Sequence, residues 1–265
     1  MSLRTYTGPT PSVRPAFALI GLGWLLVVAT MALQIAFPLV DEEARQADLA
    51  AITVVVFFLA SVVHATASHR WRGFFVVALA VPALGWVAER FGSTTGYPFG
   101  DYVYTDALGP QILDVPVVVP LAWSMMAYPT YVAASVLVTR GRWLVPVVAA
   151  WSLMAWDLFL DPMMIELGAW TWRTTEPDLP GVAGIPLTNY AGWFLVGLLI
   201  SFVLLALPAR RFSVAQPATL YLWVYASSVL AAAVFFDRPG SAVVGGVAMG
   251  IVALPFAWRL WWDRG

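Results

Sequence analysis

The sequence has no cysteine and no lysine, and it is poor in histidine and in charge. Two of its 265 residues are His, and 11% are charged, against about 25% in a soluble globular domain. Without Cys there is no disulfide, no thiolate nucleophile and no Cys-ligated metal, and two His argue against a His-rich metal site. No Walker loop, GxGxxG or HExxH motif is present, so nucleotide and zinc chemistry have no support. We expect no metal and no nucleic-acid partner.

Hydrocarbon side chains take the place of the missing charge. The chain is 61% hydrophobic with a mean hydropathy of +0.80, and apolar runs of about 18 residues or more recur along it, as in membrane-spanning helices. This predicts an all-α fold, a polytopic membrane helical bundle of about eight transmembrane helices, forming a single integral membrane domain over residues 1–265. The first span is too long for a cleaved signal, so we expect it to be retained. The expected spans are 17–39, 49–67, 72–91, 116–138, 143–160, 190–208, 217–236 and 241–262.

Arginine placement predicts the orientation of these spans. All 14 basic residues are arginine, and an even number of spans puts both termini on one side. Ten arginines fall on the side of the termini and four on the other. Because basic residues are retained in the cytoplasm, both termini are expected there, in a multi-pass protein of the cell membrane.

The carboxylates gather on the opposite, outer side. They are concentrated in two long segments, roughly 92–115 and 161–189, and on the helix ends that feed them. Long connections are usually functional or disordered, and these are too rich in Trp, Tyr, Pro and Gly to be disordered. We expect them to fold back as a cap over a pocket in the bundle.

Glu89 is the first candidate catalytic residue. It lies in the last turn of the third expected span, on one face with Pro82, Gly85 and Trp86. Ionisable groups inside a span are costly, so they are functional candidates by default. The alternative is that Glu89 only reaches to the interface, or pairs with a neighbouring group.

Asp157 and Asp161 form the second candidate. Their i,i+4 spacing near the end of the fifth span projects both from one helix face. In a dry site one of two interacting carboxylates takes up a proton, and a neutral carboxylic acid in an apolar pocket is what general-acid catalysis needs. Asp161 directly precedes Pro162, so it could instead simply end the helix.

Aromatic residues surround these acids in the sequence. Trp170 and Trp172 lie within the second acidic segment, and Tyr190 and Trp193 directly follow it, although an interfacial belt of Trp and Tyr is also expected at a membrane surface. Asn189 could cap the sixth span or hold a water molecule with its amide. Together the residue types suggest acid chemistry on a lipid-soluble alkene, in which protonation gives a tertiary carbocation that aromatic faces and a carboxylate stabilise.

Four motifs carry a resemblance to a known family: "GYPFGDYVYTDALGP" (96–110), "VPVVVPLAWSMMAYP" (115–129), "WDLFLDPMM" (156–164) and "GIPLTNYAGWF" (184–194). In this order they resemble the carotenoid 1,2-hydratase family, which includes bisanhydrobacterioruberin hydratases and gamma-carotene 1'-hydroxylases. The likeness covers about residues 72–208, the expected core of the site. It implies addition of water across the terminal double bond of an acyclic carotenoid without a cofactor, with membrane lipid around the substrate and further enzymes of the pathway as candidate partners.

The resulting site hypothesis places the segment from Glu89 to Pro110 at the mouth of the pocket, where Asp101 or Asp106 orders water. The predicted catalytic residues are Glu89, Asp157, Asp161 and Asp101. The predicted substrate-binding residues are Tyr97, Tyr102, Tyr104, Trp123, Trp156, Trp172, Asn189, Tyr190 and Trp193. The sequence leaves open which carotenoid is used, whether one or both of its ends react, which carboxyl group donates the proton, and the oligomeric state.

Three other functions remain alternatives. "DLFLD" matches the Asp-x-x-x-Asp half of an intramembrane prenyltransferase site, but the partner motif of that class is absent. A proton-coupled transporter would also use intramembrane acids, although no inverted repeat is evident. A carotenoid-binding scaffold is the third.

Overall fold

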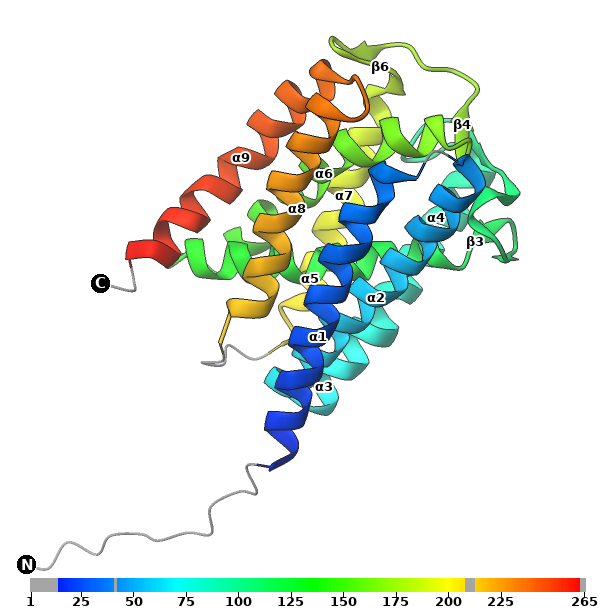
Figure 1. Ribbon diagram of the computed structural model, residues 1–265. Coiled ribbons are helices and arrows are strands. Elements are labelled where there is room, and N and C mark those ends of the chain that lie inside the picture. The colour runs from blue at the N-terminus through cyan, green and yellow to red at the C-terminus, as the bar shows by residue number, and fades with distance from the viewer. Residues whose placement is uncertain (1–13, 41, 208–212, 263–265) are drawn as a thin grey trace, which may run out of the picture.

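The structure is a computed structural model that describes residues 14–40, 42–207 and 213–262 (Figure 1). Over these residues it confirms the predicted all-α polytopic membrane bundle, and each expected span corresponds to one long helix or continuous helical segment. The helices are α1 (Arg14–Ala36), α2 (Glu43–His69), α3 (Trp71–Phe74), α4 (Val81–Thr95), α5 (Val118–Leu137), α6 (Leu144–Glu166), α7 (Leu187–Leu204), α8 (Ala215–Val234) and α9 (Pro239–Trp262). A π-helical stretch, η2 (Phe75–Ala80), joins α3 to α4, and a 3₁₀ turn, η1 (Phe37–Leu39), follows α1.

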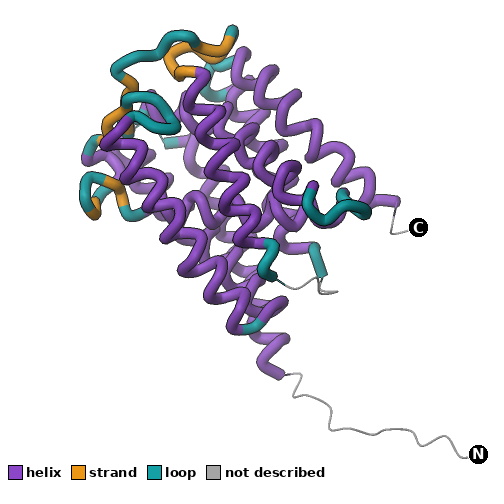
Figure 2. The backbone as a smooth tube through the Cα atoms, turned by 180° about the vertical axis from the view of Figure 1, so that it is seen from behind, coloured by secondary structure: helices purple, strands orange, loops and turns teal. Residues whose placement is uncertain are grey.

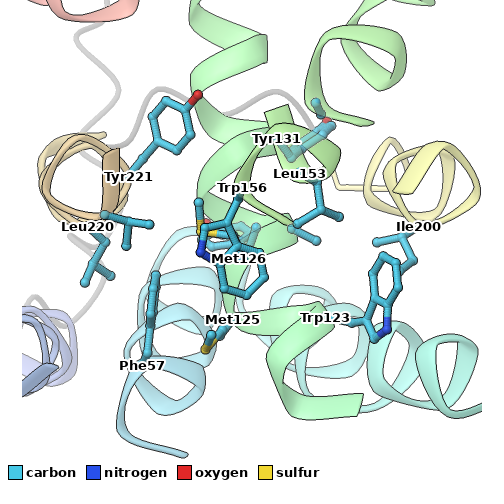
Figure 3. Packing of buried hydrophobic residues seen from close by; sticks show 14 of the residues in the cluster. Phe57, Trp123, Met125, Met126, Tyr131, Leu153, Trp156, Ile200, Leu220 and Tyr221 are labelled. Atoms are coloured by element: carbon cyan, nitrogen blue, oxygen red, sulfur yellow. The ribbon is translucent and has the colours of Figure 1, made fainter. Parts of the chain in front are cut away.

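The central helix is α5, which packs against α2, α4, α6, α7, α8 and α9. Seven helical segments of the described chain are long and apolar enough to cross a membrane, and α5 is not among them. It carries the buried polar residues Ser124 and Thr130, and Pro129 lies inside it. Because α5 is surrounded by protein rather than lipid, its surface need not be uniformly apolar. Buried side chains from α2, α5, α6, α7 and α8 meet around it (Figure 3).

The strands all lie at one end of the bundle (Figure 2). They form three antiparallel pairs, β1 (Tyr102–Tyr104) with β4 (Trp170–Trp172), β2 (Gln111–Ile112) with β3 (Val115–Pro116), and β5 (Asp178–Leu179) with β6 (Val182–Pro186). The β1–β4 pair joins the two long connections, because β1 precedes α5 whereas β4 follows α6. These connections therefore cover one end of the bundle as a single unit, here called the cap.

The opposite end of the bundle carries basic residues. Arg70 and Arg72 lie where α2 meets α3, Arg140 and Arg142 lie between α5 and α6, and Arg259 lies in the last turn of α9. Arg14 begins α1 at this same end. Six further charged residues lie outside the described residues: Arg4, Asp41, Arg210, Arg211, Asp263 and Arg264.

Candidate active site

Glu89 is buried in α4, directly beneath the cap, with 4% of its surface exposed. Its Oε2 accepts hydrogen bonds from the hydroxyl groups of Tyr102 (2.6 Å) and Tyr104 (2.7 Å), and its Oε1 accepts one from the indole N–H of Trp123 (2.6 Å). The interpretation that Glu89 only reaches to the interface is therefore wrong. Three donors converge on this carboxyl group, and the indole N–H can only donate.

The donors to Glu89 come from two elements whose local structure sets their direction. Successive side chains of a strand point to opposite faces, so Tyr102 and Tyr104 of β1 both face the bundle while Val103 faces outward. Burial, followed by the nearby Glu89 carboxylate, raises the pKa of both tyrosines well above its ordinary value. Both phenols therefore stay protonated and keep donating at neutral pH.

Close helix contacts bring the donors within reach. A Cβ at Gly85 of α4 would lie 3.1 Å from the Trp123 ring, so this glycine lets α5 approach α4. Phe99 anchors the cap between two further glycines, since a Cβ at Gly92 or Gly192 would lie 2.6 or 2.7 Å from its ring. The glycines therefore fix the depth at which the cap settles on the helices.

Asp157 and Asp161 project from one face of α6, as predicted, and are 0% and 2% exposed. The side-chain amide of Asn189 donates to Asp157 Oδ2 at 2.8 Å and also to Asp161 Oδ2. The indole N–H of Trp170 donates to Asp161 Oδ1 at 3.2 Å. Because one amide nitrogen donates to both carboxyl groups, the two groups are close neighbours, an arrangement that permits them to share a proton.

Two local expectations for these residues are wrong. Asp161 does not end its helix, because α6 continues through Pro162 to Glu166. Asn189 does not cap the sixth span, because α7 begins at Leu187 and places Asn189 inside the first turn, where its side chain is free to turn toward α6. The bridging amide is held instead by the packing of α6 against α7.

The cap links the two acidic groups. In the β1–β4 register Tyr104 lies opposite Trp170 and Tyr102 opposite Trp172. The rings of Tyr104 and Trp170 meet edge to face with centroids 5.8 Å apart. A donor to Glu89 and a donor to Asp161 therefore lie side by side on neighbouring strands.

One cavity of about 190 Å³ is lined by both acidic groups. Glu89, Asp161 and Asn189 lie in its wall, and most of the other lining residues are apolar. The remaining polar side chains of the lining are Gln34, Thr53, Tyr102, Tyr104, Ser227, Ser228, Arg238 and Ser241. Trp123 and Trp193 stack in its lining with centroids 4.0 Å apart, and Trp156 meets Trp193 edge to face at 5.9 Å. Indole faces thus stand between two buried carboxyl positions, next to a space that an apolar molecule can occupy.

Most of the predicted site residues line this cavity. They are Glu89, Tyr102, Tyr104, Trp123, Trp156, Asp161, Trp172, Asn189 and Trp193. Asp157 lies behind the wall and reaches the cavity only through Asn189 and Asp161.

Three predicted residues lie elsewhere. Asp101 forms a partly exposed ion pair with Arg173 at 3.1 Å, because it alternates with Tyr102 and so faces away from the bundle. Tyr97 is 74% exposed. Tyr190 is buried on another side of α7, in a small cluster with Leu158 and neighbouring residues. We therefore remove all three from the site.

Trp170 and Phe99 are among the lining residues that were not predicted as site residues. Trp170 was noted only as an aromatic face, although "Trp-Thr-Trp" has the strand alternation that directs Trp170 and Trp172 to the same side. Phe99 lies in a recognisable motif, but nothing in its own residue type distinguishes it from Phe91, which is exposed.

Comparisons with known proteins identify the family of the chain. A family model described as "Carotenoid biosynthesis protein" matches residues 49–255. Bisanhydrobacterioruberin hydratase of Haloarcula japonica is 33% identical over 135 residues, which cover 48% of this chain and 43% of the relative. The chain thus matches less than half the length of this curated relative. No solved structure matches.

Proposed function

The chain belongs to the carotenoid biosynthesis protein family, and from this premise we propose that it adds water across the terminal double bond of an acyclic carotenoid. One observation carries the proposal: Asp161, which is one member of a pair of neighbouring carboxyl groups, and the separately hydrogen-bonded Glu89 line one largely apolar cavity that also has indole side chains in its wall. The name of the Haloarcula japonica relative supports the same reaction class.

Asp161 is the proposed proton donor. It lines the cavity, whereas Asp157 lies behind it and shares the Asn189 amide. With one proton held between the two carboxyl groups, transfer from Asp161 to the less substituted alkene carbon leaves a tertiary carbocation. The role of Asp157 is to position that proton.

The cation forms beside stacked indole rings. Aromatic faces attract cations through their quadrupole, and Trp123 and Trp193 present such faces in the lining. The Glu89 carboxylate adds electrostatic stabilisation from across the cavity, and its own position is fixed by its three donors.

Water capture completes the reaction. A water molecule bonds to the cationic carbon and gives a proton to Glu89, so that the product carries a hydroxyl group on one carbon and the added hydrogen on the other. Return of the proton from Glu89 to the aspartate pair resets the site. No electrons are exchanged in this sequence.

The orientation of the protein in the membrane is also part of the proposal. We place the cap on the outer side and both termini in the cytoplasm, because ten of the fourteen arginines fall on the side of the termini. The reacting end of the carotenoid then lies in the outer half of the membrane.

The test is mass analysis of pigments from a host that makes an acyclic carotenoid, grown in oxygen-labelled water. We expect wild type to yield a product heavier by one labelled water, and Asp161→Asn and Glu89→Gln to lower its amount by about a hundredfold or more, the scale of general acid–base catalysis. Asp101→Asn is the matched control and should behave as wild type, because Asp101 lies outside the cavity. A product heavier by an isoprenoid unit, or oxygen that does not come from water, would refute the proposal.

A further inference from the structure

The cavity has a closed end and an open end. At the closed end both lining acids and most of the lining indoles are buried, as Asp161 and Trp193 illustrate. At the other end Ala51 of α2, with Ser228 and Ala231 of α8, line the cavity while remaining partly exposed. The cavity therefore reaches the protein surface between α2 and α8.

This open arm runs across the bundle rather than along its axis. Its lining comes from Gln34 near the end of α1, from 50–54 in the early turns of α2 and from 227–232 near the end of α8. Each of these stretches belongs to the half of its helix nearest the cap, as Glu89 and Asp161 do (Figure 1). A channel at one depth thus connects the acids with the lipid-facing side of the protein.

The walls of the arm suit a thin, stiff, apolar chain. Small side chains line the mouth from two helices, Ala50 and Ala51 from α2 and Ser228 and Ala231 from α8. A conjugated polyene is stiff and thin, so small apolar side chains along its path suit it. The cavity of about 190 Å³ holds only the end of a carotenoid, so the remainder must lie outside the protein.

Residues of α1 and the following 3₁₀ turn border the same mouth. Gln34 Oε1 accepts a hydrogen bond from Trp223 Nε1 at 2.8 Å, and Phe37 meets Phe236 edge to face at 5.9 Å. These contacts tie α1 to α8 and to the connection that follows it. The width of the opening is thereby fixed by packing.

We propose that this arm, with Ala51, Ser228 and Ala231 at its mouth, is the binding site for the polyene chain, which leaves the protein sideways into the bilayer between α2 and α8. The assignment rests on the proposed function, because it takes the end of the chain at Asp161 as the reacting end. A lipid acyl chain shares the same apolar chemistry and is the competing occupant.

The test narrows the mouth with a large side chain. Ala231→Trp fills the arm, whereas Ala233→Trp places the same side chain on the exposed face of the same helix, outside the lining. Proteins are purified in mild detergent from a host that makes an acyclic carotenoid. Bound polyene is measured by absorbance, bound lipid by mass spectrometry, and hydrated product in the cells. Because the tryptophan side chain occupies the space of the polyene, Ala231→Trp should lower bound polyene and product about tenfold or more, and Ala233→Trp should leave both unchanged.

The outcomes separate this inference from the proposed function. Ala51→Phe narrows the same mouth from the opposite wall and decides the matter if Ala231→Trp does not accumulate as folded protein. Wild-type levels of bound polyene in the narrowed variants, or a wild-type protein that retains only lipid acyl chains, would overturn the assignment. If the wild-type protein binds polyene, the narrowed variants do not, and no hydrated product forms, then the proposed function is wrong but the assignment of the arm as the polyene-binding site is supported.

Discussion

Replacing Asn189 by leucine removes the bridge between α7 and the aspartate pair while keeping a side chain of similar size. In the structure the Asn189 amide donates to both Asp157 and Asp161, and all three side chains are almost fully buried. In the leucine variant both carboxyl groups lose this donor, and they are too deeply buried for bulk water to take its place. We expect loss of both stability and hydration.

The size of the effect follows from the two bonds. Hydrogen bonds to charged groups contribute about 1.5–3 kcal/mol each, so two would give roughly 3–6 kcal/mol. Hydrogen bonds measured inside membrane bundles average nearer 0.6 kcal/mol, which puts the lower limit at about 1 kcal/mol. The complete burial of Asp157 and Asp161 favours the upper part of this range, and we expect a loss of about 3 kcal/mol.

The assay combines unfolding of the purified protein in detergent with pigment analysis of the cells. A double-mutant cycle with Asp157→Asn isolates the bridge, because residues in one hydrogen-bond network couple by about 0.5–3 kcal/mol. Additive effects of the two substitutions, or an Asn189→Leu protein with wild-type stability and wild-type product, would refute the reading of Asn189 as the residue that holds the pair.

Two further predictions concern the cap. Tyr104→Phe removes one of the two phenol donors to Glu89 while Tyr102 remains, so hydrated product should fall by about tenfold, the equivalent of one hydrogen bond to a charged group; product at the Glu89→Gln level would contradict this. Gly192→Ala places a Cβ 2.7 Å from Phe99 and should lower the midpoint of thermal unfolding by the equivalent of about 1–3 kcal/mol. Phe99→Leu should partly restore the midpoint. An unchanged midpoint in Gly192→Ala would show that the cap does not pack against this glycine.

The long apolar runs were sufficient to predict the long helices of the described residues, because a membrane span needs a long apolar stretch; α5 was predicted in the same way, although it falls short of the hydropathy of the other seven. The pair Asp157 and Asp161 was predictable for a related reason, since helical periodicity puts them on one face wherever the helix begins. Glu89 followed from the cost of an ionisable group within a span. These features depend only on local sequence.

The assignments in the cap failed where they depended on strand register. Side chains of "Asp-Tyr-Val-Tyr" alternate between the two faces of the β1 ribbon, so Asp101 and Tyr102 point in opposite directions. The segment was interpreted as a compact loop, and this alternation was not considered. Asn189 was missed as a bridge because its role depends on the distance between α6 and α7, which local sequence does not determine. The Asp161–Pro162 step was misread because helix packing overrode a local signal for a helix end.

The cap and the acids depend on each other for stability. A buried carboxyl group without hydrogen-bond partners costs several kcal/mol. The helices alone supply only some of the hydrogen-bond donors to Glu89 and Asp161. Tyr102 and Tyr104 complete the donors around Glu89, and Trp170 adds one to Asp161. The sheet that aligns these donors consists of β1 and β4 alone, so no third strand supports it. A change that unpairs β1 from β4 should therefore disturb both acidic groups together, even at positions such as Val103 that touch neither of them.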